Sequence, residues 1–548
     1  MFYSDKFVTD LITRTLLLAL SVLGAAIASI VIHDVYLWSR LPPGPLPLPF
    51  VGNKLDIPKS KPWLRFEQWS KKYGPIFTIW IGRKPTLVIS DPHVAVEMME
   101  KRSAKYSSRP RMVVMGEVYN GNSSILTQPY NKNWSIRRKL LHQALSPKAL
   151  ELYKPTQEAE AARLCYALLD NSSGWEKELE RFTSSVVFCV AYGHRIDSLN
   201  ARVISDRFRF MHNMASLNIP GKYLAETFPF LAKFPAALAP WKREVQAMGE
   251  EEAHANMALL RMVKEDVATA KAQSAPEKVP NSLCKLLLEI RESEDVPLSE
   301  KHFSYIPASL FGAGSDTTAS TLCSAFLALV TNPTVLKVAQ KELDTVVGPE
   351  RMPTFADKAK LPYIGALCKE VLRWRPVAVL GGTPHASTED DVYRGYHIPS
   401  GTTILGNSWA INLNEEYYPQ PQVFDPTRFL SGGELKGMGV SEQLYSGSRS
   451  HPSRSGHSSF GWGRRICPGA DLASNSLFIA LARLLWAYDI LPCEGIKYDT
   501  FAYTEGFNVR PQKFECIIRI RSSQHQHVLE REQMQSLAWL DKFVPFEE

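Results

Sequence analysis

A long apolar run opens the chain, ahead of a body in which apolar and polar residues alternate. No charged residue lies between Thr15 and Ile32, so this run is long enough to cross a bilayer as one helix. A cleaved signal peptide is the alternative, but the run exceeds the usual apolar core of such peptides, and a Trp and an Arg flank its far end. We predict a membrane anchor over residues 1–40, with a transmembrane helix at about 15–37.

A proline-rich segment follows the anchor. Residues 41–50 read LPPGPLPLPF. Proline fixes its own φ angle and lacks a backbone N–H, so these residues cannot form a helix and favour a stiff, extended chain. We expect a hinge that holds the following domain off the membrane.

The remainder of the chain has a mainly helical pattern. Apolar residues recur with helical spacing in six long stretches, 157–169, 244–270, 303–331, 334–346, 363–374 and 471–488. Short strand patterns occur at 77–81 and 86–90, which form a predicted hairpin, and at 392–398, 402–405 and 515–520. The predicted fold class is mainly α with small β-sheets, with one catalytic domain over residues 51–525 and a C-terminal tail over 526–548.

Two segments fit neither pattern. Residues 430–459 are rich in Gly, Ser and Arg and have little apolar content, which predicts an exposed insertion. Residues 218–241 are crowded with Leu and Phe but interrupted by Pro. Their side chains either pack in the core or form a loop that dips into the bilayer beside the anchor.

Composition narrows the class of protein. Of the 548 residues, 45% are hydrophobic and 22% are charged, which allows a large core and excludes global disorder. The net charge of +7 is spread along the chain without dense basic blocks, so we expect no nucleic-acid partner; it suits an anionic membrane surface or an acidic redox partner. The eight cysteines are scattered without a CxxC pair, which indicates neither a disulfide framework nor a zinc site and favours a reducing compartment.

Cys467 is the one cysteine whose surroundings indicate chemistry. It lies in the run FGWGRRICPG over residues 460–469, directly before a predicted helix. Glycines leave backbone N–H groups free to point at the sulfur and leave room for a flat macrocycle, while the helix dipole favours a thiolate. Taken alone, the run also allows a buried structural cysteine. It resembles the haem-ligand signature of the cytochrome P450 family, F-x-x-G-x-R-x-C-x-G, at every position: Phe460, Gly463, Arg465, Cys467 and Gly469.

A second motif lies in the middle of the helix predicted at 303–331. Residues 313–318 read AGSDTT and are similar to the A/G-G-x-D/E-T-T/S motif of the family's distal helix. The resemblance implies that Asp316 and Thr317 are catalytic and serve oxygen activation. A Thr hydroxyl that bonds back to its own helix would also bend that helix and make room for dioxygen.

Three further matches concern charged residues. Glu370 and Arg373 form the family's E-x-x-R pair, which the resemblance links to Arg428 as a structural cluster, although Thr427 stands where the family usually has Glu. Trp134 and Arg138 match its W-x-x-x-R helix. The resemblance implies that Trp134, Arg138, His385 and Arg465 bind the haem propionates, and guanidinium groups suit such carboxylates.

The resemblance covers nearly the whole chain after the anchor and implies a microsomal monooxygenase. The cofactor would be haem b with an axial thiolate from Cys467, which favours O–O cleavage. The chain has no nicotinamide or flavin fingerprint, so electrons would come from an NADPH-dependent flavoprotein reductase, with a b-type cytochrome as a second donor. The domain would face the cytosol from the endoplasmic reticulum membrane.

The implied substrate is a lipophilic small molecule, such as a polyketide or terpenoid intermediate of fungal secondary metabolism. By analogy its pocket would be formed by segments 107–128, 208–224, 304–316, 377–383 and 501–507, which are mostly apolar. Two other classes stay open: a haem-thiolate isomerase or dehydratase without external electrons, in which Asp316 and Thr317 would often be lost, and a non-catalytic haem-binding membrane protein. A haem-free membrane scaffold is the least specific alternative.

Overall fold

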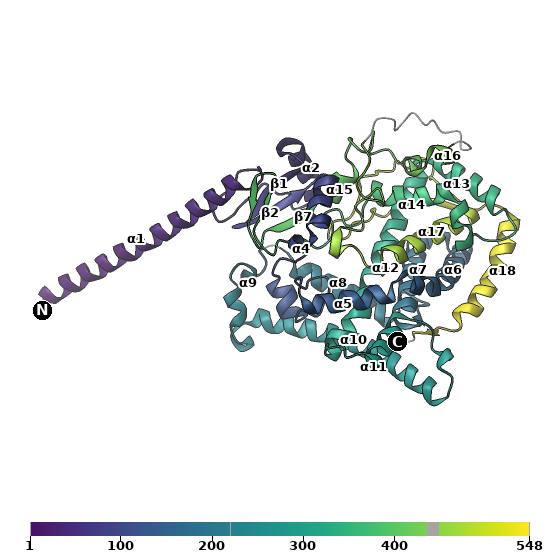
Figure 1. Cartoon of the computed structure of the whole chain (residues 1–548), viewed down its shortest axis with the longest axis horizontal. Helices are drawn as coiled ribbons and strands as arrows, with labels where there is room; N and C mark the ends of the chain where they lie inside the picture. Colours follow the sequence, from purple (N-terminus) through teal and green to yellow (C-terminus); the bar gives the residue numbers. More distant parts are fainter. Residues whose placement is uncertain (1, 220, 436–448, 547–548) are drawn as a thin grey trace.

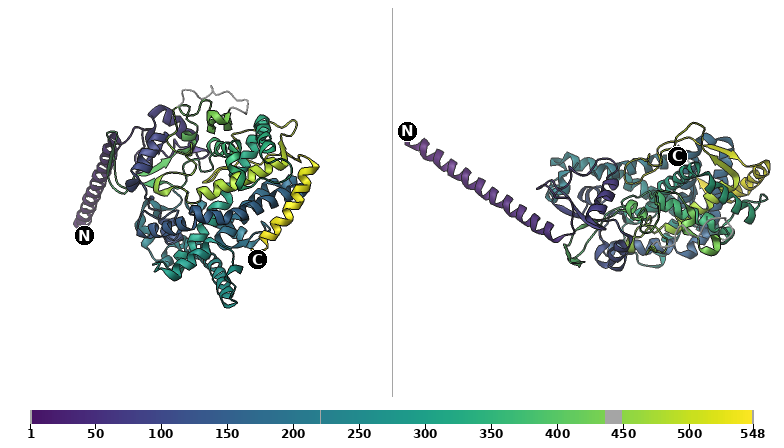
Figure 2. Two further views of the ribbon diagram at one scale, coloured as in Figure 1. Left: turned by 45° about the vertical axis from the view of Figure 1, so that its right-hand side comes forward. Right: turned by 90° about the horizontal axis from the view of Figure 1, so that it is seen from above.

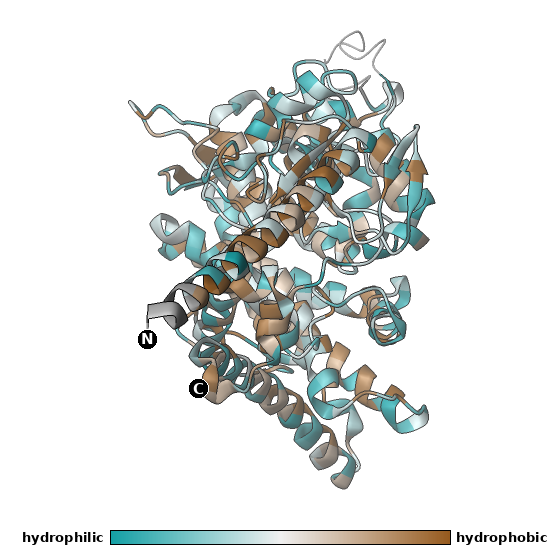
Figure 3. Ribbon diagram, turned by 90° about the vertical axis from the view of Figure 1, so that its left-hand side faces the viewer, coloured by the Kyte–Doolittle hydropathy of each residue, from teal (hydrophilic) through white to brown (hydrophobic). Residues whose placement is uncertain are grey.

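The computed structural model describes residues 2–219, 221–435 and 449–546. The long helix α1 (Phe2–Arg40) stands clear of a rounded body in all views (Figures 1 and 2). Its stretch Thr9–Arg40 is long and apolar enough to cross a membrane, and the side chains of its most apolar window are not covered by the body. Brown, hydrophobic residues dominate its middle (Figure 3). The predicted apolar helix is therefore confirmed, and it extends further at both ends.

The proline-rich segment lies against the first strand of the body. The N–H of Thr78 donates to the Pro43 carbonyl at 3.0 Å, and its hydroxyl donates to the Pro42 carbonyl at 2.7 Å. A Cβ atom on Gly44 would lie 1.9 Å from the Thr78 carbonyl oxygen, so glycine permits this close approach. Prolines cannot donate backbone hydrogen bonds but can still accept them, so the non-helical segment lies against a neighbouring strand.

The end of α1 is also attached to the body. Arg83 donates two hydrogen bonds to Asp34, at 2.7 and 2.8 Å. Leu37 and Trp38 pack against a core cluster beneath the sheet, and Leu41 is buried in it. Anchor and body are therefore joined by side-chain packing as well as by the chain.

The main sheet has the order β1-β2-β7-β4, with strands β1 (Ile76–Ile81), β2 (Lys84–Ile89), β7 (Thr403–Gly406) and β4 (His385–Ala386). β1 and β2 form the predicted antiparallel hairpin. Two small sheets pair β5 (Asp391–Tyr393) with β6 (Tyr396–Ile398) and β8 (Tyr488–Leu491) with β9 (Ile517–Ile520). The predicted strands are thus present, as small sheets beside a helical body.

Long helices form most of the body. Each predicted stretch lies within one of them, except that Tyr488, the last residue of the stretch 471–488, begins strand β8. The long helices are α6 (Pro147–Asp170), α7 (Trp175–Tyr192), α10 (Pro240–Ala272), α12 (Glu300–Thr331), α13 (Pro333–Val346), α14 (Pro362–Trp374) and α17 (Ala470–Ala487). The shorter helices are α2 (Pro62–Tyr73), α3 (Pro92–Ala95), α4 (Ser103–Tyr106), α5 (Lys132–Ala144), α8 (Arg202–Leu217), α9 (Leu224–Thr227), α11 (Leu283–Ser293), α15 (Ser408–Asn412) and α16 (Gly432–Leu435). The largest core cluster includes buried residues from α6, α7, α12, α14 and α17.

α12 runs through the middle of the body (Figure 1) and packs along α7. A Cβ atom on Gly314 would lie 2.5 Å from a methyl carbon of Val187 on α7. The small residue in the AGSDTT motif therefore permits close helix packing. It also keeps the neighbouring Asp316 and Thr317 at a fixed position along the body.

The C-terminal residues form regular structure. Helix α18 (Ser523–Leu540) packs on α6, and β10 (Val544–Pro545) pairs in parallel with β3 (His194–Arg195). Val528 and Leu529 of α18 lie in the largest core cluster. The segment predicted as a tail is thus part of the packed body.

The two irregular segments differ from each other. In 218–241, Leu224 and Leu238 are 68% and 76% exposed, and the three Phe side chains are also exposed, so the core-packing interpretation was wrong for them. Residues 436–448 of the predicted insertion lie outside the described residues. Its end is not exposed: His457 and Ser458 are buried, and Ser458 donates to Asn412 at 2.7 Å, because local polar groups replace apolar packing there.

A buried ion cluster fixes α14 to the segment before the Cys467 loop. Arg373 donates two hydrogen bonds to Glu370, both at 2.6 Å, and neither side chain is exposed. Arg428 Nε lies 3.6 Å from Glu370, which completes the predicted grouping. Thr427 does not join it; its hydroxyl donates to Asp425 at 2.6 Å.

Replacing Glu370 by Ala should strongly destabilise the fold. The change leaves Arg373 buried without its carboxylate, which costs about 3–5 kcal/mol for a buried pair. Urea unfolding followed by circular dichroism measures the loss. Glu292→Ala is the matched control, because Lys271 and Glu292 pair at 2.9 Å with 54% and 63% of their side chains exposed, and such a pair contributes less than about 0.5 kcal/mol. Equal effects of the two changes would contradict the role of the cluster.

Candidate functional site

The loop that carries Cys467 is shaped by close backbone contacts. The Cys467 N–H donates to the Phe460 carbonyl at 2.8 Å. Gly463 has a φ of 55°, and a Cβ atom there would lie 2.0 Å from the Met99 carbonyl oxygen, so only glycine fits. α17 begins directly after Gly469. The sulfur therefore lies at the N-terminal end of a long helix, whose dipole favours negative charge.

The electrostatic surroundings of Cys467 are mixed. Burial raises the pKa of its thiol, while the backbone N–H of Gly469 and the charge of Arg138 lower it. Arg138 donates to the Ile466 carbonyl at 2.5 Å, one residue before the cysteine. Binding of a soft metal ion would deprotonate such a thiol. The loop is thus suited to a metal–thiolate bond.

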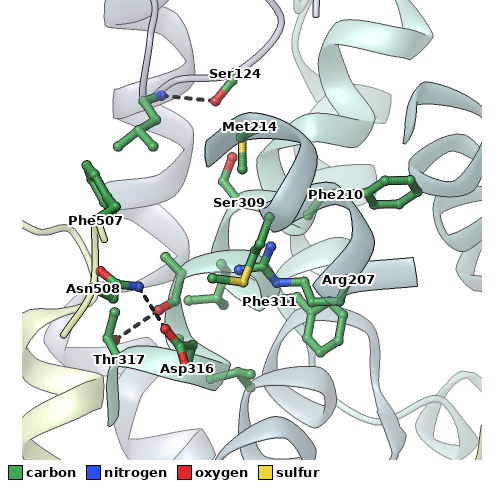
Figure 4. A pocket seen from close by; sticks show the side chains of 18 of the residues that line it. Ser124, Arg207, Phe210, Met214, Ser309, Phe311, Asp316, Thr317, Phe507 and Asn508 are labelled. Atoms are coloured by element: carbon green, nitrogen blue, oxygen red, sulfur yellow. Dashed lines mark hydrogen bonds between the residues drawn. The ribbon is translucent and has the colours of Figure 1, made fainter. Parts of the chain in front are cut away.

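The opposite wall is formed by α12 (Figure 4). The Thr317 hydroxyl donates to the Ala313 carbonyl at 2.9 Å, which is the expected bond to its own helix. Asp316 accepts a hydrogen bond of 2.8 Å from the amide of Asn508. Sequence reasoning missed Asn508, because it lies just beyond a segment that was expected only to line the pocket and no motif marks it.

One cavity of about 1770 Å³ joins these two walls. Cys467, Asp316 and Thr317 all line it, and each of the five segments expected around the substrate contributes to it. Most of its lining is apolar; examples are Phe210, Met214, Leu310, Phe311, Leu380 and Phe507. A large lipophilic molecule would therefore be largely removed from water there.

Several cationic side chains meet beside the Cys467 loop. Arg465 donates to the carbonyls of Ser107 and Gln128, both at 2.7 Å, and its guanidinium lies 4.2 Å from the centre of the Trp134 ring. Arg109 donates to the Thr383 carbonyl at 2.7 Å. The structure thus brings together residues from distant parts of the chain.

Arg109 was not predicted, because a single Arg within a loop carries no motif. It is buried, and burial lowers its pKa. Burial also lowers the pKa of Arg465, and the charges of Arg109 and Arg138 lower it further. Among the described residues, no carboxylate lies within ion-pair distance of these three guanidinium groups. Such unbalanced charge, buried at Arg109 and half-buried at the other two, fits a ligand that brings carboxylates of its own.

His385 lies near the same arginines, but its side chain is uncharged. Burial lowers its pKa to about 3, and the nearby Arg109 contributes to the shift. The ring is therefore neutral, and its Nδ1 bonds to the Tyr106 carbonyl at 2.8 Å. Nδ1 must carry the proton, so Nε2 can donate to a carboxylate only after the ring is protonated.

Two neighbouring arginines of the W-x-x-x-R helix, which is α5, point in different directions. Arg137 turns inward and donates to the Asn122 carbonyl at 3.0 Å. Arg138 points to the Cys467 loop, and Trp134 packs beneath Arg465. Of the two arginines, Arg138, the one in the motif, is therefore the one that reaches the Cys467 loop.

Comparison with known proteins adds the family. The profile of the family described as Cytochrome P450 matches residues 42–518. Cytochrome P450 monooxygenase 58 of Postia placenta is 37% identical over 501 residues, which covers 88% of this chain and 89% of that protein. FrzL of Cladobotryum and verL of Clonostachys rogersoniana, both described as cytochrome P450 monooxygenases, are 32% and 33% identical over 90% and 92% of this chain, and over 90% and 92% of their own lengths. The chain therefore belongs to the cytochrome P450 family of haem-thiolate monooxygenases.

Proposed function

We propose that the chain binds haem b through the Cys467 thiolate and uses dioxygen and NADPH-derived electrons to oxidise a lipophilic small molecule. The proposed substrate is an intermediate of fungal secondary metabolism, of polyketide or terpenoid origin. The observation that carries this proposal is the single cavity that joins Cys467 to Asp316 and Thr317. When bound, the haem-thiolate group supplies the activation of dioxygen.

The buried cations would hold the haem propionates. Arg109, Arg138 and Arg465 are unbalanced by any carboxylate in the described part of the chain, and Trp134 supports the Arg465 guanidinium. His385 would join them once a nearby carboxylate had raised its pKa. Phe460 and Gly469 complete the loop that faces the macrocycle, and Gly469 also offers its N–H to the sulfur.

Asp316 and Thr317 would deliver protons to the oxygen side of the cavity. The Asp316 carboxylate is oriented by Asn508, so its other oxygen is available to a water molecule. The Thr317 hydroxyl now donates to its own helix and can accept from water at the same time. The apolar lining excludes other water and so limits stray protonation.

We further propose a single-pass protein of the endoplasmic reticulum membrane with the body in the cytosol. The uncovered apolar surface of α1 supports the anchor, and the exposed Leu and Phe side chains of 218–241 suit contact with the same membrane. An NADPH-dependent flavoprotein reductase, with a b-type cytochrome as a second donor, would dock near the exposed Arg464 beside the Cys467 loop. Complementary charge would speed that encounter.

The first experiment compares small-molecule extracts of cells with and without this gene by high-resolution mass spectrometry. Loss of a product together with gain of a precursor lighter by one oxygen would support monooxygenation. A precursor of equal mass would instead support the isomerase alternative. Adding back the wild-type gene must restore the product before either result is accepted.

Cys467→Ala should abolish the red-shifted absorption band that reduced, thiolate-ligated haem gives with carbon monoxide, because no other ligand in the loop carries sulfur. The measurement is a difference spectrum of the purified protein. Cys493→Ala is the matched control, since Cys493 is half-buried and far along the chain from the loop. A normal band in the Cys467 variant would refute the assignment.

Thr317→Val should separate electron use from product formation. Loss of a positioned proton donor typically costs about 100-fold or more in the step that it serves, whereas NADPH consumption with the reductase should continue. Product per NADPH, measured on the substrate found in the extract comparison, is the readout. Thr331→Val is the control, because Thr331 makes the same bond to its helix, at 2.8 Å, away from the cavity. Unchanged coupling would remove Thr317 from the mechanism.

Arg109→Met should weaken haem retention. A charged hydrogen bond lost from a buried carboxylate corresponds to roughly a 10- to 100-fold change in affinity. The rate of haem transfer to excess apomyoglobin measures it. Arg111→Met is the control two residues away, where the side chain is 59% exposed and pairs with Glu117. Equal transfer rates would show that Arg109 does not bind the cofactor.

A further inference from the structure

Arg207 of α8 is a charged side chain in the cavity without a partner. Figure 4 shows it extending from α8 toward α12, where Asp316 lies. Its Nε is buried and makes no hydrogen bond within the described chain. Over the same residues, no carboxylate oxygen lies within ion-pair distance of its guanidinium. A buried donor in this state requires an explanation, because such groups are nearly always satisfied.

Gly312 of α12 provides the space for this guanidinium. A Cβ atom on Gly312 would lie 3.1 Å from Cζ of Arg207 and 3.3 Å from each terminal nitrogen. The group therefore lies against the helix backbone, four residues before Asp316. A flexible side chain held in this way is positioned by packing, with its donors left available.

The charges around Arg207 indicate what kind of group would suit it. Burial lowers the pKa of Arg207 to about 10, while Asp316 and Glu252 raise it, so the guanidinium stays charged at neutral pH. Both carboxylates already have donors: Asp316 accepts from Asn508 at 2.8 Å, and Glu252 accepts from Tyr305 at 3.2 Å. Burial raises the pKa of Glu252. With two acidic side chains already near one cation, a further anion would find little positive charge left to neutralise.

We propose that Arg207 is a specificity-determining residue that donates hydrogen bonds to a carbonyl oxygen of the substrate. This inference rests on the proposed function and narrows its substrate to lipophilic molecules with a ketone, ester or lactone group. Apolar neighbours such as Phe210, Met214 and Phe311 line the same wall (Figure 4). In such surroundings one charged hydrogen bond discriminates strongly, because competing water is excluded. The carbonyl would thus set which carbon of the substrate faces the oxidising centre.

Ligands that report on both ends of the cavity test this proposal. Alkylimidazoles of graded chain length, ending in a methyl ketone, a matched alkane or a carboxylate, are titrated into the purified full-length holoprotein. The imidazole shifts the Soret band by binding the iron. At one chain length the ketone should bind about tenfold more tightly than the alkane, as expected for a charged hydrogen bond, and the carboxylate should bind more weakly than the ketone.

Substitutions distinguish a loss of carbonyl recognition from general damage to the protein. Arg207→Met should abolish the preference for the ketone, and Gly312→Ala should reduce it by displacing the guanidinium. Arg243→Gln should keep it, because Arg243 of α10 is exposed and does not line the cavity. A Soret shift with no ketone preference at any length overturns the inference alone. A preference for the carboxylate overturns the assignment of a carbonyl, and absence of any Soret shift overturns the proposed function as well.

The melting temperature of the protein tests the proposal independently and without an added ligand. If Arg207 serves recognition, Arg207→Met removes an unpartnered buried charge and should leave the melting temperature of the ligand-free protein unchanged or higher. If Arg207 instead bridges Asp316 and Glu252 to support the fold, the same variant should melt at a lower temperature. That second result would overturn the proposal, whatever the imidazoles show.

Discussion

Positive charge that is at least partly buried and has no matching acid is the constraint on which the centre of this molecule depends. Arg109, Arg138 and Arg465 meet beside Cys467 and donate only to backbone carbonyls in the described chain. Carbonyls satisfy the donors but do not neutralise the charge. Burial lowers the pKa of Arg465, and the charges of Arg109 and Arg138 lower it further. If these guanidinium groups bind the haem propionates, as proposed, the bound cofactor would supply the missing negative charge and would stabilise the fold.

The Cys467 loop is held by a second charged group that lies outside the cavity. Arg373, paired with Glu370, donates to the Asn412 carbonyl at 3.1 Å, and the Asn412 side chain accepts from Ser458 just before the loop. Helices α14 and α15 and the segment before the loop are thus joined by one hydrogen-bonded chain. Because each member is buried, removing one leaves polar groups unsatisfied in the next. This explains how an ion cluster distant from the chemistry can position the sulfur.

The sequence predicted those features that depend on contiguous residues. The long helices, the hairpin, the Cys467 loop and the W-x-x-x-R helix are each set by local spacing, and the structure has them. Arg109, Asn508 and Arg207 could not be found in this way, because their roles arise from segments brought together only by folding. The prediction of an exposed end for the insertion failed for a related reason: side-chain hydrogen bonds to a distant segment compensated for low apolar content.

Selectivity and reactivity are linked in this molecule through the backbone of α12. Gly312 holds Arg207, while Asp316 and Thr317 lie within the next one and a half turns of the same helix. Val187 packs against Gly314 between them, so the helix cannot shift there without a clash with α7. A substrate oxygen held by Arg207 would therefore lie at a fixed distance from Asp316 and Thr317, the residues proposed to deliver protons. Recognition of one polar group could then determine where a mostly apolar molecule is oxidised.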